Sequence, residues 1–165
     1  MGKYIKPIIF ILLFAIACTY VTIDAGNANR ETTTAQSETV ATAATMSYSE
    51  RVSLLSRLIQ AEAEAEPYIG KVAVGAVLMN RVNNSQFPNS LSGVIYQSGA
   101  FESVSNGRIW AISPTSETTK AAQAAMNGWD PTYGAIYFWN PYKPVNKWMW
   151  TRTITVQYYN HVFAR

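Results

Sequence analysis

Three glutamates at two-residue spacing, Glu62, Glu64 and Glu66, form the densest group of proton-carrying side chains in this sequence of 165 residues. In an α-helix two residues subtend about 200°, so Glu62 and Glu64 would face opposite ways. Glu62 and Glu66 instead continue an apolar stripe at steps of three and four residues, formed by Val52, Leu55, Leu58 and Ile59. We therefore expect Glu62 on the buried side of a helix and Glu64 in solvent.

Two roles are open for Glu62. A carboxylate on an apolar face can be structural, paired with an Arg or with backbone donors. It can also be a catalytic acid whose pKa is raised by desolvation. The helical pattern alone slightly favours the structural role. Glu66 shares the inward face, but its position before Pro67 also suits a cap of the next helix.

The composition excludes several other chemistries. The only Cys is Cys18 and the only His is His161, so neither an intramolecular disulfide nor a zinc site of several His and Cys ligands can form. A Ser-His-Asp triad is poorly supported, because Asp24 and Asp130 are the only aspartates. The net charge of +3 comes without a dense Lys/Arg block, which argues against a nucleic-acid partner. What remains is eight glutamates and 13% aromatic residues, the side chains that sugar-handling proteins use.

Helices are expected to carry these glutamates. Ser47 and Glu50 fit a capping box at the start of a first helix, which Pro67 should end. A second helix, apolar on most sides, is predicted from Pro67 at its first helical position through Val82. Shorter helices are predicted at 90–96 and 117–127, the latter closed by Gly128.

Strand signals gather in the second half of the chain. Asn106-Gly107 lies between alternating apolar flanks and predicts a hairpin. Runs of β-branched and aromatic residues at 135–139 and 153–163 are typical of strands. Asp130 suits a turn, and His161, in its apolar strand, suits a structural histidine.

Aromatic residues are concentrated near the C-terminus, where 11 of the 21 lie between Trp129 and Phe163. Phe138 and Phe163 are expected in the core. Five others crowd a loop-like segment rich in Pro and Asn, namely Tyr137, Trp139, Tyr142, Trp148 and Trp150. That is more large rings than a small core needs. For each of them a polysaccharide groove lined by stacking rings and an ordinary core position are about equally favoured.

The first 46 residues are not expected to fold with the rest. Residues 1–25 place Lys3 and Lys6 before an apolar run at 8–17, the pattern of a secretory signal peptide, with an uncleaved N-terminal anchor as the alternative. Residues 26–46 are rich in Thr, Ala and Asn and predict a flexible linker. The chain is therefore expected to be exported, with one folded domain at 47–165.

Ordered motifs over residues 50–165 resemble the SleB/CwlJ family of spore cortex-lytic cell-wall hydrolases. EAEAEPYIGKVAV (62–74) resembles the family's EARGEPYEGQVAVAAV-type motif. Matches continue in order at NRV (80–82), FPNS (87–90), GVIY (93–96), NGWDP (127–131), AIYFWNP (135–141), WMW (148–150) and HVF (161–163). The resemblance implies a peptidoglycan-degrading catalytic domain with an α+β, lysozyme/lytic-transglycosylase-like fold. Its N-terminal half would be helical and its small C-terminal half β-rich and aromatic.

The resemblance also implies site residues. The family's essential glutamate is the first of its motif, which falls on Glu62 and makes this residue the expected catalytic acid. Asn140 resembles the Asn of the Tyr–Asn motif of lytic transglycosylases. The predicted substrate-binding set is Asn140 together with Phe101, Tyr137, Trp139 and Trp148. One departure is Glu64-Ala65 in place of the family's Arg-Gly, which makes the rim of the site more acidic.

A reaction with a single carboxylate is expected, because Glu62 and Glu66 would approach a sugar from the same side. Protonated Glu62 would cleave the bond between N-acetylmuramic acid and N-acetylglucosamine, and its carboxylate would then accept the proton of the C6 hydroxyl. The product would be a 1,6-anhydro sugar, as in lytic transglycosylation. A hydrolytic muramidase and a non-catalytic peptidoglycan-binding module are the alternatives, and the single His disfavours a zinc amidase.

No metal or organic cofactor is needed for either reaction. The expected partner is the peptidoglycan glycan strand, and the protein is expected to be a monomer. Its expected location is the cell wall, the spore cortex or the outer face of the membrane. Contact with the membrane itself is expected only through residues 1–25, if they remain uncleaved.

Overall fold

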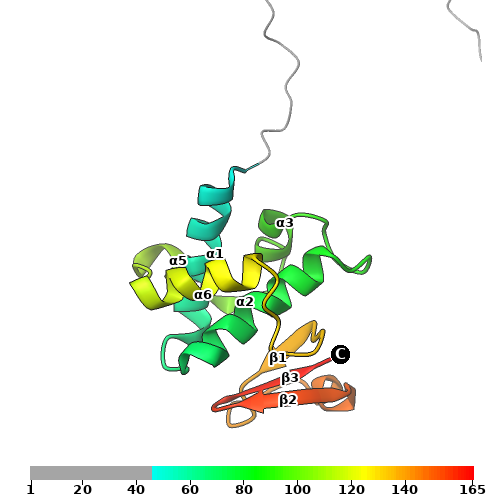
Figure 1. Cartoon of the computed structure of the whole chain (residues 1–165). Helices are drawn as coiled ribbons and strands as arrows, with labels where there is room; N and C mark the ends of the chain where they lie inside the picture. The colour runs from blue at the N-terminus through cyan, green and yellow to red at the C-terminus, as the bar shows by residue number, and fades with distance from the viewer. Residues whose placement is uncertain (1–45) are drawn as a thin grey trace, which may run out of the picture. The chain divides into compact units, whose positions relative to one another are not determined.

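A computed structural model describes residues 46–165 of the chain (Figure 1). The predicted signal peptide or anchor at 1–25 lies outside the described residues, as does all of the predicted linker except Met46. The described part is a helical layer followed by a small antiparallel sheet. Among residues 46–165, no helix combines the length and the apolarity that a membrane span requires.

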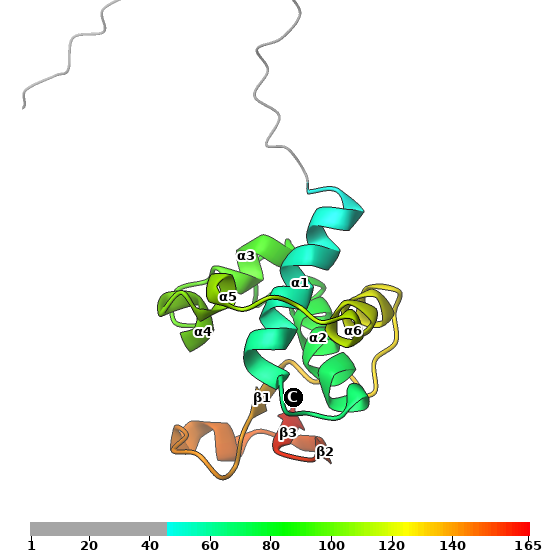
Figure 2. The same ribbon diagram turned by 90° about the vertical axis from the view of Figure 1, so that its left-hand side faces the viewer.

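Three helices form the core of the helical layer: α1 (Tyr48–Ala63), α2 (Tyr68–Val82) and α6 (Ser116–Met126). The capping box predicted at the start of α1 is present, since the Glu50 backbone N–H donates to Ser47 Oγ and the Ser47 backbone N–H donates to the Glu50 carboxylate. Pro67 is the N-cap of α2 rather than its first helical residue. Figure 2 shows α6 packed beside α2 and α1.

The close approach of α2 to α6 depends on small side chains. A Cβ atom added at Gly75 would lie 2.9 Å from the Ala125 Cβ and 3.1 Å from the Ile59 Cδ1. Both distances are shorter than ordinary carbon–carbon contacts, so the three helices meet at a point that accepts only glycine without movement. The apolar residues that α1 and α2 bring to this core include Leu55, Leu58, Val74 and Val77, all fully buried.

The hairpin predicted at Asn106-Gly107 is wrong. The segment forms two one-turn helices, α4 (Glu102–Ser105) and α5 (Arg108–Ala111), after the short helix α3 (Leu91–Ile95), which Ser90 caps as predicted. A type I′ hairpin needs positive φ at both central residues. Only Gly107 has one, at +79°, whereas Asn106 has −93° and uses its side chain to accept the Arg108 N–H.

The C-terminal half contains a three-stranded antiparallel sheet with strand order β1-β3-β2. The strands are β1 (Tyr137–Trp139), β2 (Ile154–Tyr158) and β3 (His161–Ala164), and the 3-10 helix η1 (Lys147–Thr151) lies in the β1–β2 connection. The strand region predicted at 153–163 is thus two strands, which turn at Tyr159, a residue with φ of +45°.

The two faces of the sheet pack on different partners. Phe138 and Phe163 face the helical core, and Phe163 is fully buried as predicted. Trp139, Val162 and Ala164 form a second apolar cluster with residues of the β1–β2 connection. β1 therefore alternates between the helical core and this outer cluster, and it lies at the edge of the sheet nearest to α2.

Candidate active site

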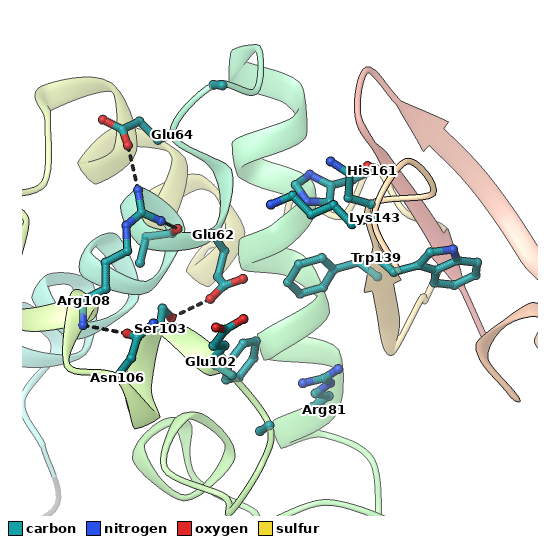
Figure 3. A pocket seen from close by; sticks show the side chains of 16 residues that line it. Glu62, Glu64, Arg81, Glu102, Ser103, Asn106, Arg108, Trp139, Lys143 and His161 are labelled. Carbon is teal, nitrogen blue, oxygen red and sulfur yellow. Dashed lines mark hydrogen bonds and ion pairs between the residues drawn. The ribbon is translucent and has the colours of Figure 1, made fainter. Parts of the chain in front are cut away.

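A pocket of about 640 Å³ lies where the end of α1, the α4–α5 segment and the sheet come together (Figure 3). Side chains that can exchange protons or carry charge line it from these elements, from the last turn of α2 and from the β1–β2 connection. They are Glu62, Glu64, Arg81, Glu102, Arg108, Lys143 and His161. The pocket is thus large enough for part of a sugar chain and rich in ionisable groups.

Glu62 projects into the pocket from the last turn of α1 (Figure 3). It is half-buried, as its place on the apolar stripe predicted. Ser103 of α4, itself buried, donates a hydrogen bond of 2.5 Å from its Oγ to Glu62 Oε1. This bond fixes one carboxylate oxygen and leaves the other free to meet a ligand.

Ser103 was not predicted as a site residue. It lies two residues after Phe101, but nothing in the local pattern shows that it meets a residue 41 positions earlier in the chain. The contact exists because α4 packs on α1, and α4 was predicted to be a strand.

Glu64 is exposed, as predicted, yet it lies at the rim of the pocket. Its carboxylate forms an ion pair of 2.9 Å with the Arg108 guanidinium, which also donates to the Ala61 carbonyl oxygen. Both members of the pair are largely exposed, so the pair contributes little to stability. The ion pair nevertheless joins the end of α1 to α5 at the pocket edge. Its acidic member, Glu64, stands where the family pattern has Arg.

Glu66 does not line the pocket. Only 4% of its surface is exposed, and it packs beneath Gly70, where an added Cβ would lie 3.1 Å from Glu66 Oε2. Its carboxylate accepts the Asn160 backbone N–H and lies 3.4 Å from His161 Nδ1. Glu66 therefore ties the start of α2 to the β2–β3 turn and is not a helix cap.

His161 is buried at the end of the pocket near the sheet. Burial lowers its pKa below the ordinary value of 6.5, Glu66 opposes this shift, and Lys143 adds to it. Its Nδ1 approaches Glu66 without the alignment of a hydrogen bond and has no other partner within residues 46–165. A neutral histidine packed against Phe138 and Phe163 fits the structural role that the sequence predicted.

The predicted substrate-binding residues fall into two groups. Phe101, Trp139 and Asn140 line the pocket, whereas Tyr137 and Trp148 lie outside its lining and stack on each other, edge to face, at 5.3 Å. Phe101 is 7% exposed and Trp139 only 5%, so neither offers a full ring face to a ligand. Figure 3 shows the Trp139 ring on the far side of its strand from Glu62.

Asn140 and Asp130, which were both considered from the sequence, accept hydrogen bonds within turns. The Asn140 side chain accepts the Tyr142 N–H, which leaves its amide group free at the pocket. Asp130 accepts hydrogen bonds from Thr132, Gly134 and the Asn80 side chain. Burial raises the pKa of Asp130, but these hydrogen bonds outweigh it and the net shift is downward. Asp130 thus stabilises the turn, as predicted, away from the pocket.

Metal ligands do not cluster in the described part of the chain. Within residues 46–165 no group of three or more His, Cys, Asp or Glu side chains is arranged to hold a metal ion.

A carboxylate at the end of a helix that faces a small antiparallel sheet across a pocket is the arrangement of a lysozyme-like catalytic domain. Residues 65–164 match the family model described as Cell Wall Hydrolase. This is more than half of the chain, and the chain therefore belongs to the cell wall hydrolase family. The matched range begins after Glu62.

Similar proteins and solved structures support the same family. The spore cortex-lytic enzyme of Bacillus cereus is 41% identical over 114 residues, which are 69% of this chain and 44% of that protein. The crystal structure of the catalytic domain of Bacillus cereus SleB matches with a TM-score of 0.65 at 41% identity, over 70% of this chain and 89% of that structure. The catalytic domain of SleB from Bacillus anthracis, described as a germination-specific lytic transglycosylase, matches with a TM-score of 0.66 at 40% identity, over 70% of this chain and 93% of that structure.

The extent of these matches is unequal. The chain spans less than half the length of the curated Bacillus cereus relative but most of the solved catalytic domains. The similarity is thus to the catalytic part of such proteins.

Proposed function

We propose that the chain cleaves the glycosidic bond between N-acetylmuramic acid and N-acetylglucosamine in peptidoglycan, with Glu62 as the general acid. The observation that carries this proposal is the setting of Glu62. It is the half-buried carboxylate of the pocket and is held by a buried hydroxyl, whereas Glu64 is exposed and paired and Glu102 is exposed. Partial burial and one fixed oxygen suit a carboxyl group that must present a proton in a defined direction.

Lytic transglycosylation is the reaction that this site supports best. The protonated Glu62 gives its proton to the glycosidic oxygen, so the N-acetylglucosamine leaves as an alcohol. The substrate's own N-acetyl oxygen supports the positive charge at C1 of the muramic acid. The C6 hydroxyl oxygen of the muramic acid then attacks C1 while the Glu62 carboxylate accepts the proton of that hydroxyl. This step closes the 1,6-anhydro ring and restores the protonated Glu62. No water is consumed.

Hydrolysis is a second candidate, and Glu102 is the observation that favours it. Glu102 enters the pocket from α4, whereas Glu62 comes from α1, so the two carboxylates belong to different walls. A muramidase needs a second carboxylate that activates water or stabilises the cation. Glu66, the residue considered for this from sequence, is excluded because it is buried against the β2–β3 turn.

The proposal extends to location and substrate source. The charged and then apolar pattern of residues 1–25 supports export, either with cleavage or as an anchor. The similarity to a spore cortex-lytic enzyme and to a germination-specific lytic transglycosylase supports spore cortex peptidoglycan as the substrate during germination, with the vegetative cell wall as the alternative. The proposed state is a monomer that binds glycan strands.

Mass spectrometry of the soluble products released from purified sacculi tests the reaction. Products that end in 1,6-anhydro-muramic acid are expected. Reducing ends would establish the muramidase, and loss of those reducing ends in Glu102→Gln would assign the second carboxylate. Binding of the folded protein to sacculi without release of any product would instead support the non-catalytic binding module.

A further inference from the structure

Arg81 is a cation of the pocket that the proposed reaction does not use. It lies in the last turn of α2 and lines the same pocket as Glu62. In Figure 3 Glu62 lies between Glu64 and Arg81, so Arg81 marks the end of the pocket opposite the acidic rim.

The stem of Arg81 is firmly positioned. Its Nε donates a hydrogen bond of 2.7 Å to the Ile136 carbonyl oxygen, just before β1. Its guanidinium lies 5.2 Å from the Phe87 ring centroid and 5.4 Å from that of Phe101. Two aromatic rings and one carbonyl therefore hold the plane of the guanidinium in place.

The two terminal nitrogens of Arg81 remain unused by the fold. Within residues 46–165 they donate no hydrogen bond, and Arg81 forms no ion pair with a carboxylate. Arg81 is half-buried and lines the pocket. Arg108, the other pocket arginine, is engaged by Glu64 and the Ala61 carbonyl.

A partly buried guanidinium without an acidic partner is costly. Burial lowers the pKa of Arg81 to about 10, and Tyr137 opposes this shift. A ligand carboxylate would recover this cost, because the two terminal nitrogens match the two carboxylate oxygens in a planar, bidentate pair.

We infer that Arg81 is a specificity-determining residue that binds a carboxylate of the muramyl residue's lactyl or peptide side chain. This inference rests on the proposed function, since it assigns a substrate group to the same pocket. Of the acidic groups of the pocket, Glu64 lies at the end opposite Arg81, and Glu62 and Glu102 lie between the two in the view of Figure 3. Arg81 directs a ligand carboxylate to the end of the pocket away from the Glu64 rim, and so sets which sugar of the alternating chain lies near Glu62.

The experiment measures the binding of small fragments by nuclear magnetic resonance titration, so it does not depend on cleavage. The first pair of ligands is the N-acetylglucosamine–N-acetylmuramic acid disaccharide and its lactyl methyl ester. The second pair is the disaccharide-dipeptide and its peptide carboxamide. The proteins are the full chain and the variants Arg81→Gln, Arg81→Lys and Lys143→Gln.

The free acid of one pair is expected to bind the full chain about tenfold more tightly than its neutral partner, the size of one charge-assisted pair. The pair that shows the preference identifies the lactyl or the peptide carboxylate as the source. Arg81→Gln should abolish the preference and Arg81→Lys should weaken it. Lys143→Gln, which removes a pocket cation without an ion pair among residues 46–165, should keep it.

Three results would overturn the inference: equal affinity for acid and neutral forms, a preference that survives in Arg81→Gln, or one that disappears only in Lys143→Gln. If Arg81→Gln does not fold, Arg81→Lys and the two ligand pairs still decide the matter. Failure of the full chain to bind any of the four fragments would instead count against the proposed function itself.

Discussion

Glu62 and Glu64 are separated by one alanine, and their surroundings give them different chemistry. Glu62 points into the pocket and accepts the Ser103 hydroxyl at 2.5 Å. Glu64 is held at the rim by Arg108 in an exposed ion pair. The difference follows from helical geometry, because the last turn of α1 directs one side chain toward the core and the other outward.

Replacing Glu62 by Gln is expected to lower the release of soluble fragments from sacculi by at least about 100-fold, since general acid catalysis is lost. The fold should persist, because the Gln side-chain oxygen still accepts the Ser103 hydroxyl. Glu64→Gln is the matched control and should keep most of the activity, since an exposed ion pair contributes at most about 1 kcal/mol. An active Glu62→Gln, or an inactive but folded Glu64→Gln, would show that the wrong carboxylate was chosen.

His161 predicts a dependence of stability on pH. Burial lowers its pKa in the folded chain, Glu66 acts in the opposite direction, and Lys143 acts in the same direction as burial. The unfolded chain therefore takes up a proton first as the pH falls below 6.5, and the free energy of unfolding decreases until the pH passes the folded-state pKa. Between about pH 7.5 and about pH 5 the melting temperature should fall further for the natural chain than for His161→Gln. Equal changes in both proteins would rule out this account.

The helices depend on close packing at one crossing point. α2 approaches α6 at Gly75, where an added Cβ would meet Ala125 at 2.9 Å and Ile59 at 3.1 Å. Alanine has the higher helix propensity, by about 1 kcal/mol, so propensity and packing make opposite predictions for this position.

Gly75→Ala is expected to destabilise the domain by about 1–3 kcal/mol, because overpacking exceeds the gain in propensity. Urea unfolding followed by circular dichroism measures the change. The double variant Gly75→Ala with Ala125→Gly should recover part of the loss, since it removes the methyl group that is met at 2.9 Å. A Gly75→Ala protein that is more stable than the natural chain would mean that the helices separate at little cost.

Elements with local signals were predictable from the sequence, and elements that depend on distant contacts were not. The Ser47–Glu50 capping box and the strand at Phe138 are encoded within a few residues and were confirmed. The Asn106-Gly107 dipeptide is compatible with a hairpin and also with a break between two helical turns. The structure has the helical turns, in which α4 packs on α1. The same packing brings Ser103 to Glu62. Because residues 102–105 were predicted as part of a hairpin, this contact of Ser103 was not predicted.

The candidate site was predictable to a similar extent. Helical periodicity placed Glu62 on the inner face, and the resemblance gave it a role that remains to be tested. Tyr137 and Trp139 lie two residues apart in β1 and share its outer face, where Tyr137 also stacks on Trp148. Aromatic composition does not show which face of the strand these rings occupy. Arg81 lies in the last turn of an apolar helix, and only the folded structure shows which of its nitrogens have hydrogen-bond partners.

At the scale of the whole molecule, residues 47–165 are expected to fold alone. Residues 47–165 contain all the buried residues of the main core, against which Met46 also packs, and both capping boxes of α1 and α6. A shortened chain that begins at Ser47 should unfold in one cooperative transition within a few degrees of the full chain. Calorimetry of both chains measures this. Loss of the cooperative transition would show that residues 1–46 contribute to the packing.

The pocket wall that carries Ser103 and Arg108 has a further consequence for how the protein responds to heat. It consists of α4 and α5, four residues each, and a helix of one turn has too few backbone hydrogen bonds to hold itself together. Such segments open while the rest of the domain stays folded. Amide protons of 102–111 should therefore exchange with deuterated water far sooner than those of α2, and each opening would release Glu62 from Ser103. On gentle warming the protein should lose its cleavage activity reversibly while its circular dichroism signal stays unchanged. If activity and ellipticity are lost together, this wall unfolds only with the core.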